Sequence, residues 1–182
     1  MTGPDLHSTS VALSSGPGRA GVAVVRLSGP HVRFVLETIA GIVPEPRHAT
    51  LRRLRDDLGE VIDTALVLYF PGPASFTGED VAEFQIHGAR AVLARLLVVL
   101  CALPGVRLAQ PGEFTRRAFE AGRLDLSAVE GLADLIDSET EWQRRQALRQ
   151  MEGALGDAAA RWRQSLIEAM ALLAAEIDFS DE

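Results

Sequence analysis

The segment Asp80–Gly88, "DVAEFQIHG", alternates apolar and polar side chains with a period of two. Successive side chains of a β-strand point to opposite faces, so this alternation predicts a half-buried strand. The face directed into the core consists of Ala82, Phe84 and Ile86. The other face carries Glu83, Gln85 and His87. This strand therefore presents a carboxylate, an amide and an imidazole on one surface.

Other strand-like segments, rich in β-branched residues, recur before residue 111, at 11–15, 21–29, 48–54, 61–70 and 106–110. The first two are joined by a loop rich in Gly and Pro. Residues 48–54 and 61–70 flank "RDDLGE", in which Gly59 predicts the turn of a hairpin.

Three helices are predicted among these strands. The first has its apolar residues at positions i, i+3, i+4 and i+7 and closes at Gly41; its apolar stripe is Val32, Val35, Leu36 and Ile39. Residues 89–105 form a strongly apolar helix that ends at Pro104 and Gly105. A third helix is expected to open on Pro111, because proline is favoured in the first turn.

From about residue 125 the pattern becomes continuously helical. Two capping boxes of the form S-x-x-E, Ser127 with Glu130 and Ser138 with Glu141, predict two helix starts. After the second start, apolar residues recur every three or four positions, at Leu148, Met151, Leu155, Ala159, Trp162, Leu166, Met170, Leu173 and Ile177. This stripe predicts one helix of about 30 residues, or ~45 Å. Such a helix needs other helices to cover it, so the chain is expected to be the front part of a longer protein.

The composition restricts the function classes. No apolar run reaches the roughly 18 residues of a membrane span, and the N-terminus lacks a signal-peptide pattern. The single cysteine, Cys101, is expected to be a small core residue in a protein of the reducing cytoplasm. The net charge of −7 resides in residues 121–182, and all 18 basic residues are Arg. Neither part has the basic surface that holds nucleic acid by its phosphates, so these residues alone are not expected to bind RNA tightly.

"GPGRAG" contains Gly16, Gly18 and Gly21 in the spacing G-x-G-x-x-G. A dinucleotide site needs a helix after this motif, and here a strand pattern follows. The hypothesis of a nucleotide-dependent oxidoreductase would have this motif as its only support. A phosphate-binding loop of the form G-x-x-x-x-G-K-[ST] does not occur, because the chain has no Lys.

Metal and acid–base chemistry find little support. None of the four His residues is paired at ligand spacing, and Glu79 and Asp80 are expected to lie in a solvated turn. Arg26, within a strand, faces either water or an anion. Glu83 and Gln85 can accept hydrogen bonds from a flat heterocycle rich in N–H groups, or can form a structural polar face. The role of His87 stays open.

Four blocks occur in order: "GPGRAGVAVVRLSG", "FPGPASFTGEDVAEFQIHG", "QPGEFTRRAFEAGRLDLSAVEGLADLID" and "EIDFSDE". Together they cover essentially the whole chain, which closely resembles the N-terminal part of the MnmE (TrmE) family of tRNA modification GTPases. The resemblance implies an α+β fold: a mixed-sheet domain over residues 1–122, similar to the tetrahydrofolate-binding domain of glycine-cleavage T protein, then the long-helix start of an all-α domain over residues 123–182. The GTPase domain and the rest of the helical domain are expected beyond residue 182.

The same resemblance implies a function. Family members form homodimers through this domain and act with the flavoprotein MnmG (GidA) on the wobble uridine of certain tRNAs at carbon 5. The one-carbon unit is expected from 5,10-methylenetetrahydrofolate, with 5-formyltetrahydrofolate as a ligand. GTP hydrolysis, dependent on magnesium and potassium, belongs to the GTPase domain, so this chain alone is expected neither to bind nor to hydrolyse GTP.

The resemblance places the folate contacts on Arg26, Glu83 and Arg123, the last at a position where family members usually carry Lys. Arg keeps the charge but is planar and longer than Lys. A carboxylate can accept from the pterin amino and N–H groups, and two Arg can hold the carboxylates of the glutamate tail. The resemblance implies no catalytic or metal residue in this chain. The alternative is a dimerisation or docking module without functional folate binding.

Overall fold

The computed structural model describes residues 7–178, apart from the side chains of residues 154, 155, 157 and 175–178. The chain divides into two compact units, Met1–Arg123 and Leu124–Glu182. Each unit is described by itself.

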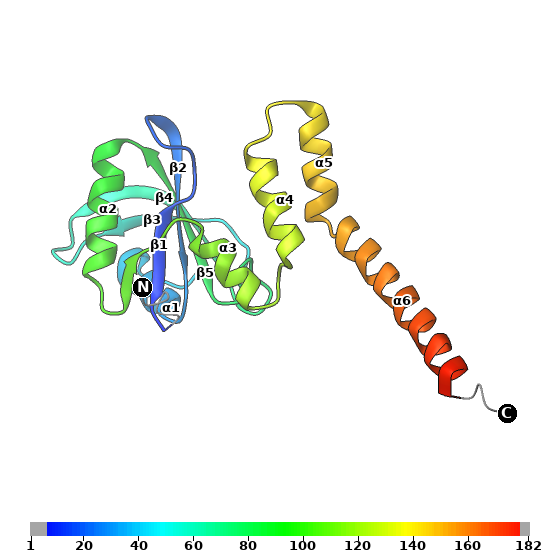
Figure 1. Cartoon of the computed structure of the whole chain (residues 1–182). Helices are drawn as coiled ribbons and strands as arrows, with labels where there is room; N and C mark the ends of the chain where they lie inside the picture. The colour runs from blue at the N-terminus through cyan, green and yellow to red at the C-terminus, as the bar shows by residue number, and fades with distance from the viewer. Residues whose placement is uncertain (1–6, 179–182) are drawn as a thin grey trace. The chain divides into compact units, whose positions relative to one another are not determined.

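The first unit is built on a six-stranded sheet (Figure 1). Its strands are β1 (Thr9–Leu13), β2 (Ala20–Ser28), β3 (Thr50–Arg55), β4 (Val61–Phe70), β5 (Val81–Gly88) and β6 (Val106–Leu108). The spatial order is β3-β4-β5-β2-β1-β6. Only the β1–β6 pair is parallel, so the sheet is mixed, as predicted.

Helices α1 (Val32–Ala40) and α2 (Arg90–Ala102) cover one face of this sheet, and α3 (Glu113–Glu120) lies on the other (Figure 1). The core lies between the sheet and the first two helices. Its largest fully buried side chains include Val25, Leu27, Leu36, Val67, Phe84, Leu96 and Leu100. Cys101 packs against this core, and burial raises the pKa of its thiol.

The periodicity predictions for the first unit are confirmed. In β5 the predicted inward residues Ala82, Phe84 and Ile86 are at most 1% exposed. The predicted stripe of α1 is buried, and Gly41 ends that helix with φ 76°, a conformation that favours glycine. β3 and β4 pair antiparallel around Gly59, as the hairpin required. The third helix begins at Glu113 with Gly112 as its N-cap residue, two positions after the predicted start at Pro111.

The second unit consists of α4 (Leu126–Ile136), α5 (Glu141–Met151) and α6 (Ala154–Asp178). Two of these helix starts were predicted near their observed positions, but the capping residues were wrong. Asp125 caps α4 by accepting from the Ala128 N–H, and Thr140 forms a capping box with Gln143 on α5. Ser and Glu fit the same template a few residues away, so the template alone does not choose the register.

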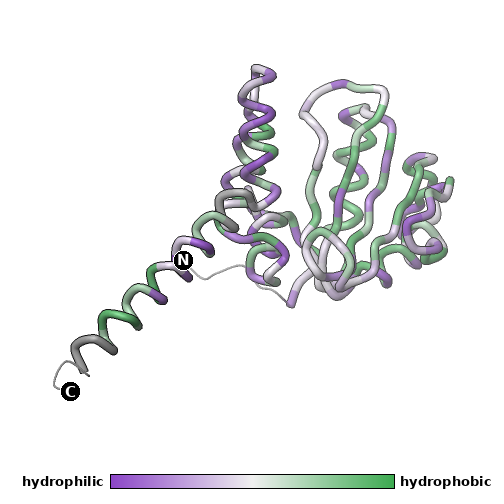
Figure 2. The backbone as a smooth tube through the Cα atoms, turned by 90° about the vertical axis from the view of Figure 1, so that its right-hand side faces the viewer, coloured by the Kyte–Doolittle hydropathy of each residue, from purple (hydrophilic) through white to green (hydrophobic). Residues whose placement is uncertain are grey.

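The prediction of one helix over the whole apolar stripe was also wrong. α5 ends at Met151, and Gly153, with φ 89°, separates it from α6. α6 still has 25 residues. Its large apolar side chains Trp162, Leu166, Ile167, Met170, Leu172 and Leu173 are between 44% and 73% exposed. Figure 2 shows apolar and polar residues interspersed along it. Within residues 7–178, we find no helix that combines the length and apolarity of a membrane span.

Candidate functional site

The structure places Arg26 and Glu83 directly opposite each other on β2 and β5. The Arg26 Nε and Nη2 donate to Glu83 Oε1 over 2.9 and 2.7 Å. Because the flanking Val25, Leu27, Ala82 and Phe84 are fully buried, this pair points to the face opposite α1 and α2. The two side chains are 29% and 16% exposed, so the pair is partly desolvated but accessible. The charge inside the β2 strand thus has an anionic partner.

Two phenyl rings lie close to the Arg26 guanidinium. Its central carbon lies 5.6 Å from the centroid of the Phe76 ring and 5.9 Å from that of Phe114. These distances are within the range of cation–π attraction. Phe76 belongs to the 71–80 loop between β4 and β5, and Phe114 belongs to α3. Two segments far apart in the sequence therefore meet at one guanidinium.

Arg123 lies against the same loop. Its Cγ is 3.6 Å from where a Cβ on Gly78 would stand, and the side chain is exposed. The 71–80 loop therefore contacts Arg26 through Phe76 and lies beside Arg123 at Gly78. Arg26 and Arg123 thus lie beside one loop, and Glu83 is joined to Arg26. Their role in folate binding stays a prediction.

The interpretation of Glu79 and Asp80 as a solvated turn was wrong. Glu79 accepts two hydrogen bonds from Arg117 Nη1, each of 3.0 Å, and one of 2.8 Å from Ser28 Oγ. Asp80 accepts from the Tyr69 hydroxyl and from the Gly72 N–H, both over 2.9 Å. Desolvation, together with this bond to Asp80, raises the pKa of Tyr69. Both carboxylates fasten the loop to the sheet and to α3.

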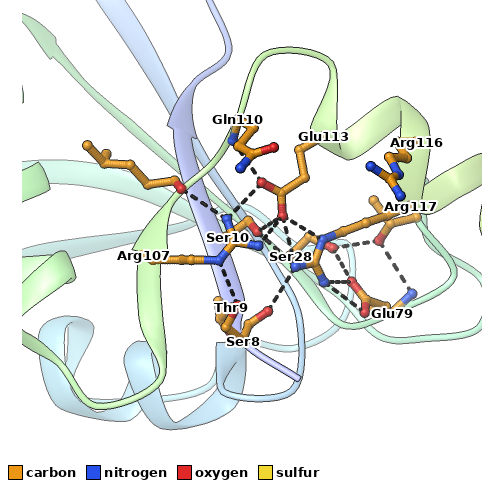
Figure 3. Close-up of polar contacts among 12 residues, drawn as sticks. Ser8, Thr9, Ser10, Ser28, Glu79, Arg107, Gln110, Glu113, Arg116 and Arg117 are labelled. Carbon is orange, nitrogen blue, oxygen red and sulfur yellow. Dashed lines mark hydrogen bonds and ion pairs between the residues drawn. The ribbon is translucent and has the colours of Figure 1, made fainter. Parts of the chain in front are cut away.

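Arg117 is the centre of a buried polar network on the α3 side of the sheet (Figure 3). Its side chain is 1% exposed, and it donates to Glu113, Glu79, Ser10 Oγ and the carbonyl of Ser8. Arg107 supplies a second guanidinium, whose Nη1 and Nη2 bind the two oxygens of Glu113 over 2.8 and 2.7 Å. Two Arg and two Glu thus balance their charges, which offsets part of the cost of burying them.

Glu113 is ionised in this network. Burial by itself would raise the pKa of its carboxyl, but hydrogen bonds from Arg107, Ser10 and the backbone N–H of Gln110 outweigh that effect. Together with Arg117 they lower the pKa of Glu113 to about 2. The carboxylate therefore keeps its charge at every pH at which the protein is expected to work.

Sequence reasoning missed this network. Glu113 and Arg117 are four residues apart on a helix, which is the spacing of an ion pair. The next pair along, Arg116 with Glu120, has the same spacing but is largely exposed. Spacing alone does not distinguish the buried pair from the solvated one, because that difference depends on which face of α3 meets the sheet.

The other candidates resolve differently. His87 is exposed, and its Nδ1 lies 2.8 Å from Asp63 Oδ1, a pairing across β4 and β5 that the sequence left undecided. No helix follows Gly16, Gly18 and Gly21, because β2 begins at Ala20 and already contains Gly21. Among the residues that the structure describes, we find no cluster of three or more His, Cys, Asp or Glu able to hold a metal ion.

The first unit is a mixed-sheet domain with a partly desolvated ion pair on the face where α3 lies, and a helical unit follows it in the chain. The family model described as "GTP-binding protein TrmE N-terminus" matches residues 9–123, and the model "MnmE helical domain" matches residues 126–182. The chain therefore belongs to the MnmE (TrmE) family. This confirms the resemblance seen in the sequence and the α+β fold expected from it.

Individual relatives agree. The chain is 62% identical over 175 residues to the tRNA modification GTPase MnmE of Beijerinckia indica, a match that covers 96% of this chain and 39% of the relative. It is 59% identical to the MnmE of Phenylobacterium zucineum, with 97% and 40% coverage. For the MnmE of Parvibaculum lavamentivorans the identity is 60%, with 96% and 40% coverage. The chain thus spans about two fifths of the length of these relatives.

Proposed function

We propose that this chain is the folate-binding and homodimerisation region of a cytoplasmic tRNA modification GTPase. In the whole protein it would act with MnmG to add a C5 (carboxymethyl)aminomethyl group to the wobble uridine of certain tRNAs. The one-carbon unit would come from 5,10-methylenetetrahydrofolate. GTP, magnesium and potassium would be used by a GTPase domain outside these residues.

The observation that carries this proposal is the ion pair of Arg26 and Glu83 on the face of the sheet where α3 lies. A fully buried pair would be a structural device, and a fully exposed one would contribute little. At 29% and 16% exposure, each charged group keeps hydrogen-bonding capacity that a ligand can reach. The flat rings of a folate bound here could pack against the phenyl rings of Phe76 and Phe114.

The chemistry of the ligand fits these groups. Glu83 uses Oε1 for both of its hydrogen bonds with Arg26, so Oε2 can accept from the amino and N–H groups of a pterin. Arg26 and Arg123 can bind the carboxylates of the glutamate tail through charge-assisted hydrogen bonds. The described residues hold no reactive constellation beside this pair, so the proposal is binding of folate and not a catalytic step by this chain.

Calorimetric titration of the chain with 5-formyltetrahydrofolate tests the proposal. We expect saturable binding, weakened about tenfold or more by Arg26→Ala and by Glu83→Gln, since each change removes a charge-assisted hydrogen bond of ~1.5–3 kcal/mol. Glu83→Gln keeps the size of the side chain, so its effect reports charge and acceptor capacity. Glu37→Ala, at an exposed position of α1, is the matched control and should leave the affinity unchanged.

A folded chain that gives no heat over a full titration, and no rise in melting temperature with the ligand, would contradict folate binding. That result would favour the alternative of a dimerisation or docking module. Sedimentation of the same sample tests homodimerisation separately, because a monomer at all concentrations would remove that part of the proposal only.

A further inference from the structure

The Glu79–Arg117 ion pair joins the two segments that supply the phenyl rings beside Arg26. Phe76 lies three residues before Glu79 on the 71–80 loop, and Phe114 lies three residues before Arg117 on α3. Neither charged residue has a hydrogen bond to Arg26 or Glu83 among the contacts of the described residues. Any influence on that pair must therefore pass through the loop and the helix.

We propose that Glu79 and Arg117 are positioning residues for the candidate site: their ion pair holds the 71–80 loop against α3 so that Phe76 and Phe114 stay within cation–π distance of the Arg26 guanidinium. This inference rests on the folate-binding function proposed above. It assigns a role to a network whose centre, the Arg117–Glu113 pair, is 1% exposed on each side.

Burial and hydrogen bonds hold the Arg117 side chain in place. With its side chain 1% exposed, the guanidinium has no water to replace a lost partner. Both hydrogen bonds of its Nη1 go to Glu79, while Nε and Nη2 bind Glu113. Arg107 of β6 in turn binds Glu113, so contacts with the sheet fix the position of the Arg117 Nη1 (Figure 3). Glu79 is thus attached to a fixed point.

Glu79 is also attached to β2. Ser28 Oγ donates to Glu79 Oε2 over 2.8 Å, and Ser28 and Thr77 hydroxyls lie 2.7 Å apart. Ser28 is two residues after Arg26, so both side chains share one face of the strand. Glu79 therefore connects the strand that carries Arg26 with the helix that carries Phe114. Small displacements of such supporting groups reduce the fit of a binding site.

Phe76 lies on the 71–80 loop between two strands. Loops between strands lie on the surface and move more than the elements that they connect. Phe76 is 38% exposed, so packing alone holds it weakly. Thr77 next to it is fully buried and bonded to Ser28. The polar contacts of Thr77 and Glu79, rather than the phenyl ring, keep this part of the loop in place.

Glu79→Gln tests the inference in the full chain, since it keeps the size of the side chain and removes its charge. We expect the affinity for 5-formyltetrahydrofolate to fall about tenfold, or ~1.4 kcal/mol. We also expect the nuclear Overhauser contact between the Arg26 Nε–H and the Phe76 ring to weaken without ligand. The matched control is Asp56→Asn, which breaks another ion pair with one buried partner: Asp56 is 1% exposed, and Arg95 of α2 is 46% exposed. This control should lower the melting temperature and leave both readouts unchanged.

The outcomes are distinct. If the wild type binds and Glu79→Gln binds equally well, or if Asp56→Asn weakens binding as much, the positioning role is wrong. If the wild type does not bind, the proposed function fails; the contact between Arg26 and Phe76 then still decides whether Glu79 positions the loop. An unchanged contact in Glu79→Gln would overturn the inference in either case.

Discussion

Replacing Glu113 with Gln should remove about 3 kcal/mol from the free energy of unfolding of the first unit at pH 7. The pKa of Glu113 is lowered from 4.5 to about 2 by folding. Each unit of such a difference corresponds to ~1.36 kcal/mol, which gives about 3 kcal/mol. The hydrogen bonds lead to a similar figure. An amide nitrogen in place of Oε2 would face Arg107 and the Gln110 N–H, and in place of Oε1 it would face Arg107, Arg117 and Ser10. At least two charge-assisted bonds of ~1.5–3 kcal/mol each would be lost, less what relaxation recovers.

The sign of the pH dependence follows from the lowered pKa. The ionised form is favoured by the folded state, so this stabilisation is fully present above about pH 4.5 and is lost as the pH falls toward about 2. The difference between wild type and Glu113→Gln should therefore shrink to about half near pH 3. Taking a difference between the two proteins removes the contributions of Asp56 and Asp63, whose pKa values are also lowered.

The assay must report the first unit alone. Both Trp residues, Trp142 and Trp162, lie in the second unit, so tryptophan emission follows that unit. Urea unfolding should instead be followed by the methyl resonances of Val25 and Val67, which are fully buried in the first. The control Glu120→Gln breaks an exposed helical pair and should cost no more than about 0.5 kcal/mol. A Glu113→Gln protein as stable as the control, or a difference independent of pH, would refute the reasoning.

The second unit offers two further predictions. Gly131→Ala should lower its melting temperature, because the added Cβ would stand 2.5 Å from the backbone nitrogen of Met151; the overpacking cost of ~1–3 kcal/mol exceeds the gain of about 1 kcal/mol in helix propensity. Trp142 fluorescence measures this, and a rise in melting temperature would contradict it. Thr140→Ala should destabilise α5 by about 1 kcal/mol through loss of its capping box, whereas Thr140→Ser should restore most of that amount in the same assay. Equal melting curves for the two Thr140 variants would count against the cap.

Much of the fold could be predicted from local patterns. The period-two alternation of β5 and the helical stripe of α1 specify which side chains are buried, because a wrong assignment would place charges in the core. The pairing of Arg26 with Glu83 could be predicted only in part. The sequence placed one charge on each of two strands, and the family resemblance assigned both residues to the same ligand. That β2 and β5 are neighbours, with these residues in register, depends on long-range pairing.

The helical unit shows where local patterns are ambiguous. Ser127 and Ser138 fit a capping template as well as Asp125 and Thr140 do, and the template contains no information on the backbone path. The apolar stripe continued across Gly153, so periodicity suggested one helix. The positive φ of Gly153 ends that continuity, and a stripe of apolar residues does not reveal such a break.

The amino-acid sequence by itself determined the family, the order of the elements in the first unit and the two faces of β5, because these follow from residue patterns along the chain. Only the tertiary structure decided the surroundings of Glu79, Glu113 and Arg117. In the sequence these are ordinary charged residues of a loop and a helix. They become a buried network because α3 packs its Arg117 side against Ser10 of β1, where each charge must find a partner to be desolvated. Burial is a property of the assembled chain, and it separates this network from the solvated pair one residue away.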